Sequence, residues 1–147
     1  MLKLSNRGLY GIKALYELAR LYGGAPVTIR EISERHGLPV PFLEQVLHRL
    51  RIAGIVEGRR GINGGYVLSR SPGEITIGDA VRALEGPIAL CDCLQKASSE
   101  KTPDRARACV TSNIYRRLGR EVEKAFDSIT LLDLASEEHE EIRVGKC

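Results

Sequence analysis

The sequence predicts a mainly α-helical fold that carries one small β-hairpin. Apolar residues recur at intervals of three and four along most of the chain, which is the spacing of one helix face. Between residues 55 and 68 this spacing stops, and a glycine-rich stretch separates two short apolar runs, as in a hairpin. A hydrophobic fraction of 43% over 147 residues is globular, which excludes wholesale disorder, and no apolar run is long enough to span a bilayer.

The first predicted helix runs from Asn6 to Tyr22. Ser5 or Asn6 can cap its start, and Gly23 and Gly24 end it because glycine readily leaves the helical conformation. We expect its buried face to consist of Leu9, Ile12, Leu15, Leu18, Ala19 and Tyr22.

The next two predicted helices form a helix-turn-helix. Thr28 caps a helix from Ile29 to His36, with Glu31 in the position of a capping box, and Gly37 closes it. Prolines are tolerated in the first turn of a helix, so Pro39 and Pro41 mark the start of a third helix that ends at Gly54. Its expected apolar face is Phe42 or Leu43, Val46, Leu47, Leu50 and Ala53.

The predicted hairpin leaves through Ile55 and Val56 and returns through residues 66–68. Five positions between them are expected to supply the positive φ angles of tight turns: Gly58, Gly61, Asn63, Gly64 and Gly65. After a turn at residues 71–73, Thr76 or Ile77 begins a helix that buries Ile77, Ala80, Val81 and Leu84 and stops at Gly86 and Pro87.

The second half of the chain is predicted to contain a polar loop, a long helix and a short one. The loop covers residues 92–108, and the long helix spans about Val110 to Ile129, with Ile114, Leu118, Val122 and Phe126 between them on its apolar face. Thr130 caps a last short helix that runs through Ala135, and the acidic run at 137–141 is a solvated tail. We expect the long helix to pack against a partner subunit; the alternative is that it folds back on its own domain.

A helix-turn-helix followed by a basic hairpin is the layout of a winged DNA-binding domain. Residues 1–86 hold 12 Lys and Arg against 8 Asp and Glu, which suits a polyanionic partner. Glu44 and Gln45 near the start of the third helix carry the donors and acceptors that read base edges in a major groove. Four arginines are candidates for phosphate or minor-groove contacts, namely Arg49, Arg51, Arg59 and Arg60. Taken singly, a Glu or Gln on a helix is more often an ordinary solvated residue, and arginines are common on hairpin surfaces. The placement of these residues beside the wing is what favours DNA contact.

Five segments resemble the Rrf2 family of bacterial regulators, the IscR/CymR/NsrR group. They are Leu4–Gly11, Phe42–Gln45, Arg60–Tyr66, Leu84–Ile88 and Phe126–Leu134. The resemblance implies a homodimeric winged helix-turn-helix repressor or activator, joined through crossed long helices, that reads an imperfect palindrome in double-stranded DNA. It also implies that DNA contacts come from Glu44, Gln45 and the wing that contains Arg60, and we add Phe42 and Asn63 as candidates. Pro41 and Phe42 stand where relatives often have Ser and Tyr.

The four cysteines all lie in the second half, at Cys91, Cys93, Cys109 and Cys147. Iron–sulfur members of the family place three cysteines in the loop before the long helix; Cys93 and Cys109 look like the outer two, and Cys91 could substitute for the absent middle one. The resemblance therefore favours a two-iron two-sulfur cluster on Cys91, Cys93 and Cys109, since thiolates prefer such centres. The fourth ligand is unassigned, and Cys147 is expected in the tail.

Other interpretations of the cysteines stay open. Cys91 and Cys93 could form a strained, easily reduced disulfide or a thiol switch, and free thiols are a further alternative. The cysteines lack the paired C-x-x-C spacing that is typical of a zinc site. A thiol oxidoreductase is a remote rival, because the chain shows no catalytic constellation, P-loop or dinucleotide fingerprint. One family relative complexes with a cysteine-synthesis enzyme, so a partner of that kind is a further alternative.

Three segments result: a winged DNA-binding domain at 1–86, a cysteine-bearing sensor loop at 87–109, and a dimerisation helix with an acidic tail at 110–147. The first residues lack the apolar core and cleavage site of a signal peptide, so we expect a cytoplasmic protein.

Overall fold

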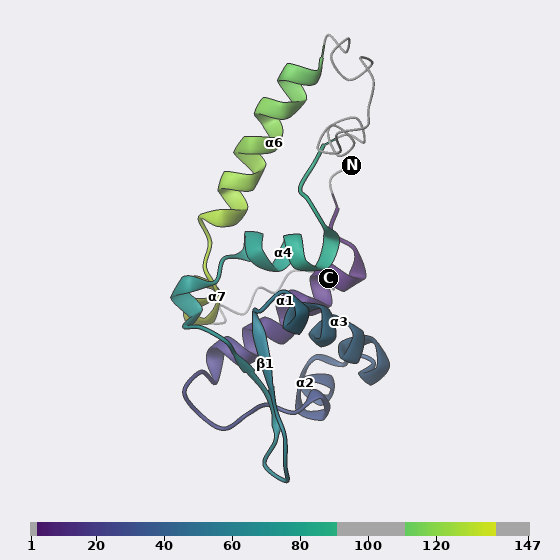
Figure 1. The fold of residues 1–147 in the computed structure, drawn as a ribbon, viewed down its shortest axis with the longest axis vertical. Coiled ribbons are helices and arrows are strands. Elements are labelled where there is room, and N and C mark those ends of the chain that lie inside the picture. The colour runs from purple at the N-terminus through teal and green to yellow at the C-terminus, as the bar shows by residue number, and fades with distance from the viewer. Residues whose placement is uncertain (1–2, 91–110, 138–147) are drawn as a thin grey trace.

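The computed structural model describes residues 3–90 and 111–137. The predictions for the loop at 92–108, for all four cysteines and for most of the acidic tail lie outside these residues. Figure 1 shows helices α1 to α4 gathered in one body, a hairpin that extends from it, and α6 projecting from the other end.

Helix α1 (Asn6–Arg20) is the central helix of the core and is capped by Ser5, whose Oγ accepts from the amides of Arg7 and Gly8. The predicted buried face was wrong at its two ends, since Leu9 is 43% exposed and Tyr22, beyond the helix, is 51% exposed. The buried face instead begins with two small residues, Gly8 and Gly11. A Cβ at Gly11 would lie 2.1 Å from Leu84 Cδ1, because α4 crosses α1 at this point.

The helix-turn-helix consists of α2 (Ile29–His36) and α3 (Val40–Ile52), within a residue or two of the predicted bounds. The capping box of α2 is confirmed: the Glu31 amide donates to Thr28 Oγ1 at 3.2 Å, and the Thr28 amide donates to Glu31 Oε2 at 2.7 Å. Gly37 ends α2 at φ 63°, a left-handed conformation that favours glycine.

The wing is an antiparallel hairpin of β1 (Val56–Arg59) and β2 (Gly65–Leu68), paired from Val56 with Leu68 to Arg59 with Gly65. The hairpin is confirmed, but only Gly61 and Gly65 have positive φ among the five positions expected. The expectation was wrong for Gly58, Asn63 and Gly64. Gly64 is instead restricted by close approach, since a Cβ there would lie 2.4 Å from the Arg59 carbonyl oxygen.

The remaining elements are the 3₁₀ turn η1 (Pro72–Glu74), α4 (Ile77–Glu85), α6 (Ser112–Asp127) and α7 (Leu131–Ser136). Helix α4 buries the four apolar residues predicted for it. Helix α6 leads away from the core along most of its length, whereas α7 returns to it (Figure 1). Leu131 of α7 is fully buried in the same core as α1 and α4.

No helix within the described parts of the chain is long and apolar enough to cross a membrane.

Candidate nucleic-acid interface

Helix α3 has one face in the core and one face in solvent. Its buried residues are Leu43, Val46, Leu47 and Leu50. The exposed face carries Glu44 and Gln45 in the first turns, followed by His48, Arg49 and Ile52. The two residues predicted to read bases therefore lie on the accessible side of the helix that a winged domain inserts into the major groove.

Phe42 occupies a different environment from the other candidates on α3. It is half-buried, and its ring packs edge-on against Tyr10 of α1, with ring centroids 5.1 Å apart and an interplanar angle of 76°. Aromatic pairs favour this geometry. Phe42 thus fastens the start of α3 to α1, which positions Glu44 and Gln45 whether or not Phe42 itself meets DNA.

Two of the four candidate arginines have a side-chain partner, and the other two do not. The Nη2 of Arg51 donates to His48 Nδ1 at 3.3 Å, and the Nη2 of Arg59 lies 3.3 Å from Glu57 Oε2. Among the described residues, the guanidinium groups of Arg49 and Arg60 have no hydrogen-bond or ion-pair partner. Unpaired, exposed guanidinium groups bind phosphate without first breaking a contact. Arg49 and Arg60 are therefore better placed to bind the DNA backbone than Arg51 and Arg59.

The tip of the wing lies at the far end of the hairpin from the core. Arg60 and Asn63 are exposed there, and between them Ile62 is fully exposed. Sequence reasoning missed Ile62, although an isoleucine between Gly61 and Asn63 in a turn has no core to enter. The wing is held along β2 by Val27, which exchanges two backbone hydrogen bonds with Tyr66 at 2.8 and 3.0 Å.

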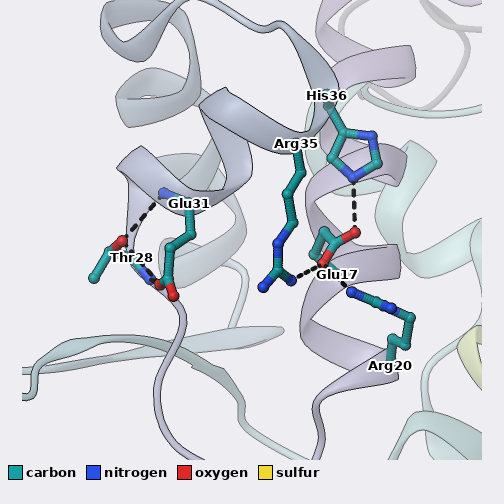
Figure 2. Close-up of polar contacts among 6 residues, drawn as sticks. All are labelled: Glu17, Arg20, Thr28, Glu31, Arg35 and His36. Atoms are coloured by element: carbon teal, nitrogen blue, oxygen red, sulfur yellow. Dashed lines mark hydrogen bonds and ion pairs between the residues drawn. The ribbon is translucent and has the colours of Figure 1, made fainter.

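A second feature missed by sequence reasoning is the buried carboxylate of Glu17 (Figure 2). Arg35 Nη1 donates to its Oε2 at 2.6 Å and Arg20 Nη2 at 3.2 Å, while His36 Nε2 lies 3.1 Å from its Oε1. Arg35 and His36 end α2, so one α1 carboxylate holds the C-terminal end of the first helix of the helix-turn-helix. The sequence did indicate the burial of Glu17, because this glutamate stands between Leu15 and Leu18, two residues of the predicted buried face.

Burial by itself would raise the pKa of Glu17. The hydrogen bonds from Arg35 and Arg20, the charge of Arg20 and the contact with His36 outweigh it and lower that pKa from its ordinary value of 4.5. Glu17 is therefore a charged group within the core whose two oxygens are bound by side chains of α1 and α2.

The structure does not bring together a metal site within residues 3–90 and 111–137, where no group of three or more His, Cys, Asp or Glu side chains could hold an ion. The predicted ligands Cys91, Cys93 and Cys109 lie outside these ranges.

Comparison with known proteins agrees with this geometry. Residues 4–137 match the model of the Rrf2 family, described as an iron-dependent transcriptional regulator. The HTH-type transcriptional regulator CymR of Bacillus subtilis (strain 168) is 37% identical over 135 residues, which cover 92% of this chain and 91% of that protein. The regulator IscR of Sodalis glossinidius is 33% identical over 137 residues, which cover 93% of this chain and 81% of that protein.

Solved structures show the same relationship. The structure of B. subtilis CymR has a TM-score of 0.76 and 38% identity, covering 94% of this chain and 99% of that chain. The structure of T. potens IscR has a TM-score of 0.73 and 37% identity, covering 98% of this chain and 94% of that chain. These relatives are regulators and not enzymes. The chain therefore belongs to the Rrf2 family, and it is a winged-helix transcriptional regulator that binds DNA.

Proposed function

We propose that the chain acts as a homodimer that places two winged helix-turn-helix units on an imperfect palindromic operator. The observation that carries this proposal is the pairing of an exposed polar face on α3 with an exposed apolar stripe on α6. The polar face of α3 suits a charged ligand such as DNA. The apolar stripe of α6 suits an apolar partner.

The stripe on α6 consists of Ile114, Tyr115, Leu118 and Val122, which share one side of the helix at three- and four-residue spacing. Ile114 is 60% exposed and Leu118 is 49% exposed in the single chain. Large apolar side chains gathered on an otherwise charged helix mark an interaction surface. A second copy of α6 supplies a matching stripe, because a two-fold symmetric interface uses the same patch on both subunits.

In this arrangement Gln45 pairs with adenine and Glu44 accepts from cytosine N4 in the major groove. Arg49 contacts phosphate from α3, and Arg60, with Asn63, does so from the wing or enters a narrow minor groove. Arg51 and Arg59 must first leave His48 and Glu57, so they contribute less.

The test combines sedimentation with DNA binding. Duplexes selected from a random library by the purified protein should contain two inverted half-sites, and each duplex should bind two chains. A chain that sediments as a monomer at micromolar concentration, or that binds an isolated half-site as tightly as the full palindrome, contradicts the proposal.

We further propose that Cys91, Cys93 and Cys109 make DNA binding responsive to iron or oxidation, most simply as ligands of a two-iron two-sulfur cluster. Support comes from the donor set, since thiolates are the preferred ligands of these clusters, and from the description of the family as iron-dependent. When bound, the cluster would supply a centre that is sensitive to oxidation. The cysteines stand between α4 and α6 in the chain, so any change in their ligation acts on the segment that leads into α6.

Anaerobic purification tests the cluster. A brown protein with visible absorbance and equal iron and sulfide contents is expected, and replacing Cys91, Cys93 and Cys109 by alanine should abolish all three signals. Cys147→Ala is the matched control and should leave them unchanged.

A cluster-free thiol switch is the second candidate. B. subtilis CymR is described as a global cysteine regulator, and CymR of Staphylococcus aureus, 30% identical with a TM-score of 0.70, has been solved in an oxidised form. These relatives favour a sensor that uses thiols directly. A regulator that works with a cysteine-synthesis enzyme is a further alternative. A colourless, iron-free protein whose operator affinity changes reversibly with a thiol reductant would select the thiol switch over the cluster.

A further inference from the structure

Arg82 of α4 and Asp127, the last residue of α6, form a two-point contact between these helices. Arg82 Nη2 lies 2.6 Å from Asp127 Oδ1, and Arg82 Nη1 lies 3.3 Å from Asp127 Oδ2. Parallel N–H···O contacts between a guanidinium and a carboxylate restrict the relative orientation of the two groups as well as their distance. The hydrogen bond with Asp127 raises the pKa of the Arg82 guanidinium, although burial opposes it.

The carboxylate of Asp127 lies directly over the first turn of α4. Thr76 Oγ1, which caps α4, also donates to Asp127 Oδ1 at 3.4 Å. A Cβ added at Gly78 would lie 1.8 Å from the same oxygen. The φ of Gly78 is not positive, so an alanine there would carry no backbone strain, and its Cβ would push the Asp127 carboxylate aside.

Backbone contacts hold the chain just beyond Asp127 to the same place. The Ile77 amide donates to the Ile129 carbonyl at 2.8 Å, and the Leu131 amide donates to the Ile75 carbonyl at 2.9 Å. The C-terminal end of α6 is therefore fixed to the core, while its opposite end projects away from it (Figure 1).

We propose that Arg82 and Asp127 are positioning residues that fix the angle between α6 and the DNA-binding core, and through it the separation of the two wings in the dimer. This inference rests on the proposed dimer through α6. A helix of 16 residues is about 24 Å long, so a tilt of about 10° at its base displaces its far end by about 4 Å. That displacement exceeds the rise of about 3.4 Å per base pair, so it is enough to change which half-site spacing the dimer fits.

The contact is well suited to orientation and poorly suited to stabilisation. The side chains of Arg82 and Asp127 are 37% and 43% exposed, so solvent screens much of their attraction and the pair contributes less to folding stability than a buried pair would. Variants of this pair should therefore change the geometry of the dimer and leave its melting temperature almost unchanged.

The test measures the distance between the two wing tips. Replacing the fully exposed Ile62 by a spin-labelled non-natural amino acid leaves all cysteines in place, and double electron–electron resonance on the full-length dimer gives the interspin distance. We expect Asp127→Asn and Gly78→Ala to shift or broaden the distance distribution by about 4 Å or more, with a melting temperature within about 4 °C of the parent. Gly73→Ala is the matched control, because its Cβ would lie 3.6 Å from Leu132 Cδ2, an ordinary contact.

Arg82→Lys keeps the positive charge but loses the two-point geometry, and an intermediate broadening is expected from it. Unchanged distances in Asp127→Asn and Gly78→Ala, in a protein that still sediments as a dimer, would overturn this inference alone. A parent protein that sediments as a monomer would overturn the proposed dimer and this inference with it.

Discussion

At the scale of single residues, Glu17 links α1 to the helix-turn-helix through Arg35 and His36 (Figure 2). Its lowered pKa has a consequence for stability. A carboxyl whose pKa is lower in the folded state than in the unfolded state stabilises the fold above the unfolded value, here 4.5. That contribution is lost as the pH falls through the folded value. Protonation removes the charge that the arginines bind.

We therefore predict that Glu17→Gln lowers the free energy of unfolding by about 2 kcal/mol at about pH 7, where a charge-assisted contact is replaced by neutral ones. The difference between parent and variant should shrink as the pH falls below 4.5. Urea unfolding over a pH series measures it. Other carboxylates with lowered pKa, such as Asp79 and Asp133, affect both proteins equally and cancel in the difference.

The control is Glu34→Gln. Glu34 pairs with Arg30 at 3.0 Å on the surface of α2, with both side chains largely exposed. Such pairs contribute up to about 0.5 kcal/mol, so a small change with little pH dependence is expected. A Glu17→Gln effect that grows on acidification would show that Glu17 is not a charged partner of the arginines.

Arg60 is the residue through which the wing is expected to contact DNA. Arg60→Ala should weaken binding to a selected operator by about tenfold or more and reduce the slope of log affinity against log salt by about one, because one phosphate contact is lost. Fluorescence anisotropy titrations at several salt concentrations measure both. Arg120→Ala, an exposed arginine on α6, should change neither. Equal affinities for Arg60→Ala and the parent would remove the wing from the interface.

At the scale of elements, the wing depends on a close approach between Val27 and strand β2, at the residue that pairs with Arg59 at the turn end of the hairpin. Gly65 has φ 154°, and a Cβ there would lie 2.6 Å from the Val27 carbonyl oxygen, which accepts the Tyr66 amide. We predict that Gly65→Ala breaks this bridge, so that the Val27 and Tyr66 amides exchange faster with solvent hydrogen and operator affinity falls. Hydrogen exchange followed by NMR tests this.

Gly58→Ala provides the comparison within the same hairpin. Gly58 has no positive φ, and nothing lies within 4 Å of a Cβ added there. Its amide exchange and DNA affinity should match those of the parent. Equal protection of Val27 in both variants would mean that the wing does not need this bridge.

Local signals predicted the elements well, because caps and turns act over a few residues. The capping box at Thr28 and Glu31 and the cap at Thr130 are present as expected. The buried face of α1 could not be predicted from its own periodicity. Gly8 is buried there because Glu85, from a distant helix, accepts its amide at 3.1 Å, and that contact exists only after folding.

The candidate site, too, could be predicted from the sequence only in part. The exposure of Glu44, Gln45 and Arg60 follows from helix periodicity and from the position of the turn, both of which can be read from sequence. The pairing of Arg59 with Glu57, and the packing of Phe42 on Tyr10, depend on side-chain geometry. Sequence reasoning therefore identified the surface and could not rank the residues within it.

At the scale of the whole molecule, the chain leaves the core at the end of α4 and returns to it at α7. Thr76 and Thr130 form an isolated backbone bridge, and Leu131 is buried beside α1. The division of the sequence at residues 86 and 109 remains a prediction. The described core, however, contains residues from both halves of the chain. A fragment ending at residue 86 would lack Leu131 and would leave a cavity in the core where that side chain packs.

The exposed stripe on α6 leads to the last prediction, that Leu118→Arg separates the subunits. Leu118 does not belong to the core of the single chain, so the variant should keep its fold and melting temperature. An arginine in the middle of the stripe would bury a charge without a partner in the dimer, and sedimentation should show a monomer. Once the subunits separate, the second half-site no longer binds intramolecularly, and operator affinity should fall by about 100-fold or more. Leu132→Arg, the same change at an exposed leucine of α7, should leave the oligomeric state intact. If Leu118→Arg sediments as the parent does, the two reading heads are joined through some other surface, and the apolar stripe on α6 needs a different partner.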